Sequence, residues 1–160
     1  MRKVIVNSTP LIALCKVGAL DVLKRLYGEI TIPEAVYREI LFKRDSACQQ
    51  VQENGDWIKL QRIRNDEARG LFEASLHAGE VETMILALES PPALVVMDDY
   101  KARQKARTLG LTFTGTLGVL LRAKAENIVP KVAPLLFKLK EQGIYITDRV
   151  LEQALQTAGE

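Results

Sequence analysis

The sequence predicts an α/β fold with three layers, in which helices cover both faces of a central, mostly parallel sheet of four or five strands. Short β-branched segments alternate with longer segments of helical periodicity, which is the pattern of right-handed crossovers between parallel strands. The strand segments are nearly continuous apolar runs, as expected for strands buried on both faces. With 160 residues and 48% hydrophobic content, the chain suits one domain, 1–160. Within it we expect a core at about 3–125 and a helical extension at about 129–158.

The expected strands are short and lie between turn-forming residues. "KVIV", "EITI" and "ALVVM" are the clear cases, "DWIKL" is a further candidate and "LTF" is weaker. "KVIV" occupies residues 3–6, "EITI" 29–32 and "ALVVM" 93–97. "DWIKL" occupies 56–60 and "LTF" 111–113.

The expected helices have recognisable beginnings and ends. Pro10 suits the first helical position after an Asn7-Ser8-Thr9 cap, and Gly18 is a plausible end. "EVETMILALE" is apolar on almost every side, as expected for a helix buried within a domain. The further helices are predicted at 19–26, from Pro33 through "PEAVYREILFK", and at roughly 116–126, 130–142 and 147–157.

Composition excludes some classes of function. The 22 basic and 20 acidic residues nearly balance, so net charge alone does not indicate a nucleic-acid-binding protein. The single His77 excludes zinc sites that need several histidines, and Cys15 and Cys48 are expected to be reduced thiols in or near the core. The beginning of the chain lacks the pattern of a signal peptide, and no apolar run approaches the roughly 18–20 residues of a membrane span. We therefore expect a soluble, cytoplasmic protein without a membrane partner.

Acidic and hydroxyl side chains follow the expected strands at their carboxyl ends. In "VVMDDYKARQKAR" an apolar strand ends in two adjacent carboxylates, and basic residues follow at alternate positions. Open parallel sheets bind ligands beyond the carboxyl ends of their strands, so these side chains are expected to converge at one edge. The set comprises Asn7, Ser8, Glu39, Glu80, Glu82, Asp98, Asp99, Thr114 and Thr116.

Such a cluster favours a divalent cation. Carboxylates within about 4–6 Å raise each other's pKa, and a bound cation removes that repulsion. Oxygen ligands select Mg²⁺ or Mn²⁺, which can activate water for phosphoryl displacement. Basic residues beyond Asp99 would then contact phosphates that flank the one being cut. The expected phosphate contacts are Lys101, Arg103 and Arg107.

Each residue also has a simpler interpretation. The acidic pair could cap the following helix, and Glu82 could be a first-turn glutamate favoured by the helix dipole. Glu80 and Glu82 lie two residues apart, so they face different directions on a helix and are not expected to share one role. Glu39 alone would be a solvated helix residue, and Ser8 a cap. A receiver-like phosphoacceptor domain would instead carry acidic residues where this chain has Asn7.

The ordered set of motifs resembles the PIN domain nucleases, the superfamily that includes the VapC-type toxins of toxin–antitoxin pairs. "VIVNSTPLIAL" stands where those families have a strand, an Asp, then Thr or Ser and an apolar helix, and "ITIPEAVYREI" places Glu39 at the second acidic position. "GEVETMILA" supplies Glu82 and Glu80, and "LVVMDD" supplies Asp98 and Asp99. "LTFTGTLGVLLRAK" is similar to the last strand and helix of a bacterial and archaeal branch. The likeness covers roughly 3–125.

The resemblance implies a PIN-like fold and metal-dependent hydrolysis of RNA that leaves a 5′-phosphate. Asp98, Glu82 and Glu39 would hold Mg²⁺ or Mn²⁺, and Asn7, Asp99 and Glu80 would assist. Ser8, Thr114 and Thr116 would orient water or phosphate, while Lys101, Arg103 and Arg107 would bind the RNA. The toxin branch further implies a small antitoxin partner and a homodimer.

One position departs from the family pattern. Asn7 stands where PIN enzymes carry an Asp, and an amide offers an oxygen without a charge. The alternative is therefore a catalytically inactive PIN-like module that binds RNA or a protein partner.

Overall fold

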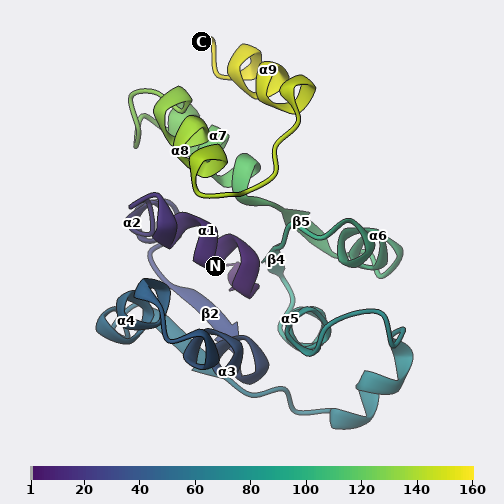
Figure 1. Ribbon diagram of the computed structural model, residues 1–160. Helices are drawn as coiled ribbons and strands as arrows, with labels where there is room; N and C mark the ends of the chain where they lie inside the picture. The colour runs from purple at the N-terminus through teal and green to yellow at the C-terminus, as the bar shows by residue number, and fades with distance from the viewer. Residues whose placement is uncertain (1) are drawn as a thin grey trace.

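The computed structural model describes residues 2–160, and its centre is a sheet of five parallel strands in the order β3-β2-β1-β4-β5 (Figure 1). Helices flank the sheet, so the predicted three-layer α/β/α fold is confirmed. The register is continuous across the middle of the sheet, because Val6 pairs with Val96 and Val96 pairs with Thr114. The strands are β1 (Lys3–Val6), β2 (Ile30–Pro33), β3 (Ile58–Gln61), β4 (Ala93–Val96) and β5 (Thr112–Thr114).

Helices connect these strands and continue beyond the last one. The crossovers contain α1 (Ser8–Lys16), α2 (Asp21–Tyr27), α3 (Glu34–Lys43), α4 (Ser46–Glu53), α5 (Ala78–Glu89) and α6 (Tyr100–Thr108). After β5 come α7 (Thr116–Ala125), α8 (Ala133–Glu141) and α9 (Asp148–Thr157). No helix within residues 2–160 has the length and apolar character needed to span a bilayer.

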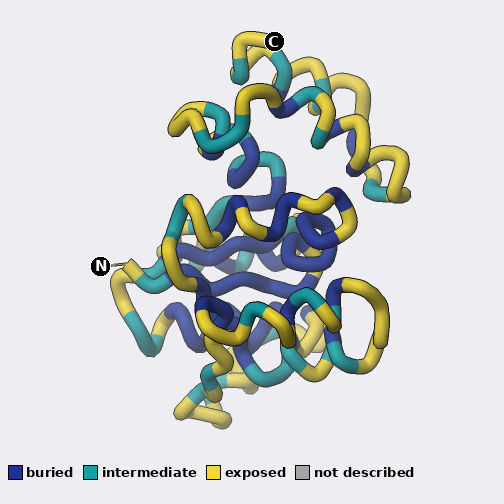
Figure 2. Tube along the Cα trace, turned by 90° about the vertical axis from the view of Figure 1, so that its left-hand side faces the viewer, coloured by how far each residue is buried: buried dark blue, intermediate teal, exposed yellow. Residues whose placement is uncertain are grey.

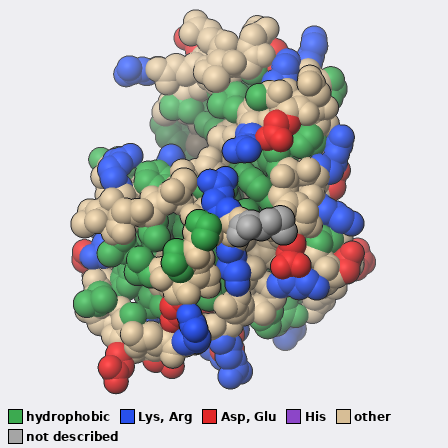
Figure 3. All heavy atoms as spheres, turned by 180° about the vertical axis from the view of Figure 1, so that it is seen from behind, with side chains coloured by type: hydrophobic (Ala, Val, Ile, Leu, Met, Phe, Trp, Pro, Cys, Tyr) green, Lys and Arg blue, Asp and Glu red, His purple; other side chains and the backbone are tan. Residues whose placement is uncertain are grey.

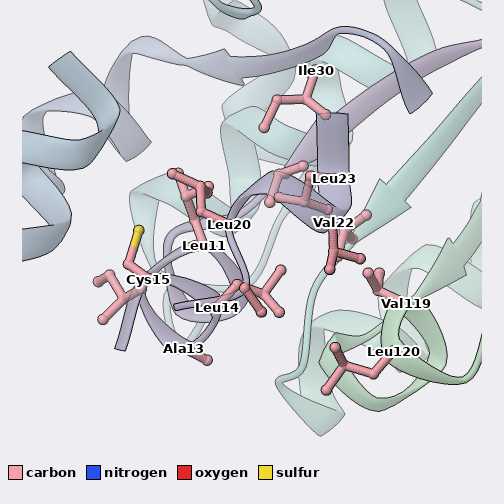
Figure 4. Close-up of a cluster of buried hydrophobic side chains, with 14 of the residues drawn as sticks. Leu11, Ala13, Leu14, Cys15, Leu20, Val22, Leu23, Ile30, Val119 and Leu120 are labelled. Atoms are coloured by element: carbon pink, nitrogen blue, oxygen red, sulfur yellow. The ribbon is translucent and has the colours of Figure 1, made fainter. Parts of the chain in front are cut away.

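The inner strands β1, β2 and β4 are buried (Figure 2). Alternate side chains of β1 and β4 enter two separate cores. Val4 and Val6 belong to the core that contains side chains of α1, α2 and α7. Figure 4 shows Leu14, Leu23 and Leu120 of these helices in that core. Ile5 points to the opposite face, where it packs with Val95 and with α5 and α6. This double burial explains why the strand sequences lack polar alternation.

The C-terminal helices pack on the same chain. Leu136 and Leu139 of α8, Ile146 before α9 and Ala154 within α9 belong to the core that also contains α1 and α7. The carboxylate of Glu160 accepts hydrogen bonds from the backbone N–H groups of Val132 and Ala133 and pairs with Lys124. These contacts cap the beginning of α8 and tie the last residue to it.

Two segments differ from the sequence expectation. Helix α4 lies between β2 and β3, where no separate element was predicted, and a 3₁₀-helix, Asp66–Leu71, lies in the connection to α5. Asp45 explains the first, because its side chain accepts hydrogen bonds from Ala47 N–H and Cys48 N–H and so caps α4. The 3₁₀-helix has no buried residues and hence no apolar periodicity to predict it.

Candidate active site at the carboxyl edge of the sheet

The carboxyl ends of β1, β4 and β5 lie at one edge of the sheet, and four helices begin there. The backbone continues the sheet pairing past the strands, since Asn7 N–H donates to Val96 O at 2.9 Å and Met97 N–H to Thr114 O at 2.9 Å. Helices α1, α6 and α7 start within four residues after these strands, and α5 starts beside Asn7. Helix N-termini carry partial positive charge, so the edge favours anionic groups.

Asn7 and Glu39 face each other across the first turn of α5. A Cβ added at Gly79 would lie 3.2 Å from Asn7 Oδ1 and 3.3 Å from Glu39 Oε2, so both oxygens point at this glycine. The Ser8 hydroxyl donates to Glu39 Oε2 at 2.6 Å. Asn7 Oδ1 is buried, and no hydrogen-bond donor within residues 2–160 reaches it. A buried acceptor without a donor is costly, so this oxygen is a candidate cation ligand.

The Glu80 carboxyl lies close enough to Asp99 and Glu39 for their charges to affect its pKa. Burial raises the pKa of the Glu80 carboxyl, the hydrogen bond from His77 N–H lowers it, and the charges of Asp99 and Glu39 raise it further. In total, the pKa of Glu80 is raised above its ordinary value. The His77 N–H to Glu80 Oε1 bond, at 2.9 Å, is part of a capping box that begins α5. Glu80 therefore has a structural role and also belongs to the acidic group.

Glu82 points in a different direction from Glu80, as the two-residue spacing predicts. Its Oε1 accepts from Ala35 N–H at 2.9 Å, and its Oε2 pairs with Arg69 of the 3₁₀-helix. Together with Glu39 it lines a cavity of about 610 Å³, which Arg69 also lines. The Glu82 side chain is 7% exposed, so Arg69 supplies the counter-charge that this buried carboxylate requires.

Asp98 and Asp99 are adjacent in sequence but have different environments. Asp98 Oδ1 accepts from Thr116 N–H at 2.8 Å, and Asp98 Oδ2 accepts from the Thr116 hydroxyl at 2.6 Å. Asp98 is therefore fixed against the beginning of α7. Asp99 is exposed and caps α6, accepting from Ala102 N–H at 3.0 Å.

The basic residues of α6 separate into two groups. The guanidinium groups of Arg103 and Arg107 lie 5.1 and 5.4 Å from the centre of the Phe113 ring, within cation–π range. Arg103 lines a cavity of about 510 Å³ together with Asp98, Thr114 and Thr116. Lys101 lines a different cavity, between α6 and the segment that precedes α5. Of the three predicted phosphate contacts, Arg103 is the one that lines the cavity of Asp98.

The structure brings the predicted site residues into two neighbouring groups. Asn7, Ser8, Glu39, Glu80 and Gly79 form one, and Asp98, Thr114, Thr116 and Arg103 form the other. Within residues 2–160, no three Asp, Glu, His or Cys side chains stand close enough to form a ready-made metal cage. Mg²⁺ commonly binds through one or two carboxylates and retains several waters, so it does not require such a cage. The donors that are present, carboxylate oxygens and a buried amide oxygen without a hydrogen-bond donor, fit a hard divalent cation.

Three residues at the edge were not predicted from the sequence. Arg69 forms an ion pair with Glu82, and Tyr145 lines the cavity of Asp98. The ring of Phe113 makes cation–π contacts with Arg103 and Arg107. Phe113 was within the weakest predicted strand, where its alternation with Thr112 and Thr114 placed it on one face of the sheet. Arg69 and Tyr145 lie in connections without periodicity, so no local pattern indicated them.

Comparison with known families identifies the fold. Residues 3–160 match the family described as the PIN domain. The chain therefore belongs to the PIN domain family, whose members are in general hydrolytic nucleases that use divalent metals. The resemblance seen in the motifs is confirmed at this level, and the match includes the C-terminal helices. No curated protein matches the chain.

Replacing Glu80 with glutamine tests the electrostatic coupling of the acidic group. The pKa of Glu80 is raised above its ordinary value of 4.5, so folding favours the protonated form and stability is lost as pH rises through the raised pKa. Glutamine can still accept from His77 N–H and carries no charge. In chelator, we expect Glu80→Gln to gain stability relative to the parent as pH rises, because the parent then carries a charge that burial and the neighbouring carboxylates disfavour. Urea unfolding of the parent and of Glu80→Gln across pH 4–8 measures their free energies of unfolding. If the difference between these two free energies does not change with pH, the coupling is contradicted.

Proposed function

We propose that this protein is a ribonuclease that hydrolyses RNA phosphodiester bonds with Mg²⁺ or Mn²⁺ bound at the carboxyl edge of the sheet. One observation carries the proposal: the buried amide oxygen Asn7 Oδ1, which accepts no hydrogen bond from residues 2–160, lies near carboxyl groups that are electrostatically coupled. Membership of the PIN domain family supports it, because PIN domains in general are metal-using nucleases.

Each group at the edge has a proposed role. Asp98, Glu39 and Glu80 would hold the cation with Asn7 Oδ1, while Asp99 would assist through its charge. When bound, the cation would activate water and stabilise the oxygens of an in-line displacement. Thr116 fixes the Asp98 carboxylate, and Ser8 orients Glu39. Glu82 would join the ligands once Arg69 moves from it.

The basic side chains of α6 would bind the RNA. Arg103 and Arg107 would contact phosphates, since guanidinium groups bind phosphate oxygens in a bidentate manner. Thr114 lines the same cavity as Asp98 and would orient a phosphate there. Lys101, in the neighbouring cavity, would contact the RNA farther from the cleaved bond. Hydrolysis would add water to phosphorus, break the bond to the 3′ oxygen and leave a 5′-phosphate.

A second function also has support. The uncharged Asn7 and the ion pair of Arg69 with Glu82 both reduce the negative charge available to a cation. These two features favour an inactive PIN-like module that binds RNA or a protein without cutting. As the first of these two functions, the ribonuclease would be the toxin of a toxin–antitoxin pair, and we then expect a small antitoxin, a homodimer and a cytoplasmic location.

Incubating RNA with the purified protein distinguishes the two functions. A ribonuclease cuts RNA in Mn²⁺ or Mg²⁺, stops in chelator and resumes when metal is restored. An inactive module leaves RNA intact in every condition, and its RNA binding is indifferent to metal. The 5′ ends of any products should be ligatable, because they carry phosphate; products with 5′-hydroxyl ends would contradict the proposed chemistry.

A further inference from the structure

A cavity of about 510 Å³ lies between the candidate active site and the loop that joins α8 to α9. One wall contains Asp98, Arg103 and the beginning of α7. The other wall contains Leu139 of α8 and the loop residues Ile144, Tyr145 and Ile146. The surface is hollowed between the C-terminal helices and the rest of the molecule (Figure 3). The volume of this cavity is within the range of about 300–1,000 Å³ typical of small-ligand pockets.

The loop presents an aromatic ring to solvent from a fixed backbone. Gly143 has a φ of +84°, a conformation that favours glycine, and it ends α8 and redirects the chain. Ile146 is buried in the core, and Thr147 caps α9, so the loop is anchored on both sides. Tyr145 between these anchors is 88% exposed. Exposing a large aromatic side chain beside a cavity suits contact with a ligand.

The opposite wall carries a positive charge that is available to an anion. The Arg103 guanidinium stacks on Phe113, and among residues 2–160 it makes no ion pair with a carboxylate. Its position is thus set by an aromatic ring, and its donors remain free for phosphate. The cavity therefore combines an exposed aromatic ring, an apolar lining and a free guanidinium next to Asp98.

We infer that Tyr145 is the stacking platform for an unpaired base of the RNA, adjacent to the phosphate that is cut. The inference rests on the proposed function and narrows the substrate to single-stranded RNA. An unpaired base offers its π-face to Tyr145 while its phosphate reaches Arg103. Duplex RNA keeps its base faces stacked inside the helix, so it cannot use the platform. Because every base has a π-face, we expect little sequence preference, with purines stacking more strongly.

Equilibrium binding of labelled oligoadenylate to the full chain in chelator tests the platform without any cleavage. We expect Tyr145→Ala to weaken binding about tenfold, since base–aromatic stacking contributes that order of affinity. Tyr145→Phe keeps the ring and should bind within about twofold of the parent. Phe137→Ala is the matched control, because Phe137 is a half-exposed aromatic residue of α8 outside the cavity. A duplex of the same length should bind equally to all variants.

The outcomes separate the platform from the nuclease. If Tyr145→Ala binds oligoadenylate as the parent does while the parent cuts RNA in Mn²⁺, the platform is wrong and the ribonuclease stands. If Tyr145→Ala weakens binding but no metal restores cleavage, the ribonuclease is wrong and the platform stands. If the parent binds no single-stranded RNA and also cuts none in Mn²⁺, both are overturned.

Discussion

Replacing Asp98 with asparagine is expected to reduce RNA cleavage by about a hundredfold or more, because a metal-assisted displacement depends on several kcal/mol of charge stabilisation at this carboxylate. The fold should be retained. Asparagine has the same size, and its Oδ1 can still accept from Thr116 N–H, the contact that places Asp98 at the beginning of α7. We therefore expect the free energy of unfolding to change by less than about 1 kcal/mol.

Cleavage of labelled RNA in Mn²⁺, with urea unfolding alongside, measures both effects. Asp148→Asn is the matched control, because the Asp148 side chain is 94% exposed and pairs with Lys140 at the surface. The control should cut RNA at the parental rate. Equal cleavage by Asp98→Asn and the parent would mean that the active site has been placed wrongly.

Replacing Gly115 with alanine is expected to reduce cleavage at least tenfold while leaving every charge in place. The new Cβ would lie 2.6 Å from Asp98 Oδ1 and 3.4 Å from Met97 O, so the Asp98 carboxylate must move. That carboxylate is held by two hydrogen bonds from Thr116, and moving it weakens both. We expect the free energy of unfolding to fall by about 1–3 kcal/mol.

The cause of this effect is steric and not conformational. Gly115 has a φ of −127°, which alanine adopts without strain. Gly55→Ala is the control, because its nearest neighbour, Gln52 O, would be 3.8 Å from the new Cβ. If Gly115→Ala cuts RNA as fast as Gly55→Ala, the position of Asp98 against Thr116 does not matter for the reaction.

The fold could be predicted because its information is local. Apolar runs such as "VIV" and "LVV" identify strands buried on both faces, and the beginning of α9 follows from the capping preference of Thr147. The parallel arrangement then places Asn7 and Asp98 at one edge without any knowledge of the three-dimensional structure. The connection before α5 could not be predicted, because its 3₁₀-helix buries no residue.

The roles of individual acidic residues could not be predicted, because distant partners set them. The Glu82 carboxylate is paired with Arg69, which lies in that same unpredicted connection. Asp98 and Asp99 look equivalent in the sequence. Thr116, eighteen residues later in the chain, holds Asp98, whereas Asp99 bonds only to its own helix. Tyr145 reaches the site because the C-terminal helices fold back onto the core.

Calorimetric titration of Mn²⁺ into chelator-treated protein tests the central claim most directly, with the parent and Asn7→Asp compared. A new carboxylate at position 7 adds a charge beside Glu39 at a buried position, 4% exposed in the parent. We expect Asn7→Asp to bind Mn²⁺ about tenfold or more tightly than the parent, and to be less stable than the parent in chelator. Saturable binding by the parent, strengthened by this substitution, is the predicted result; indistinguishable titration curves, or none that saturates, would contradict a cation site among these oxygens.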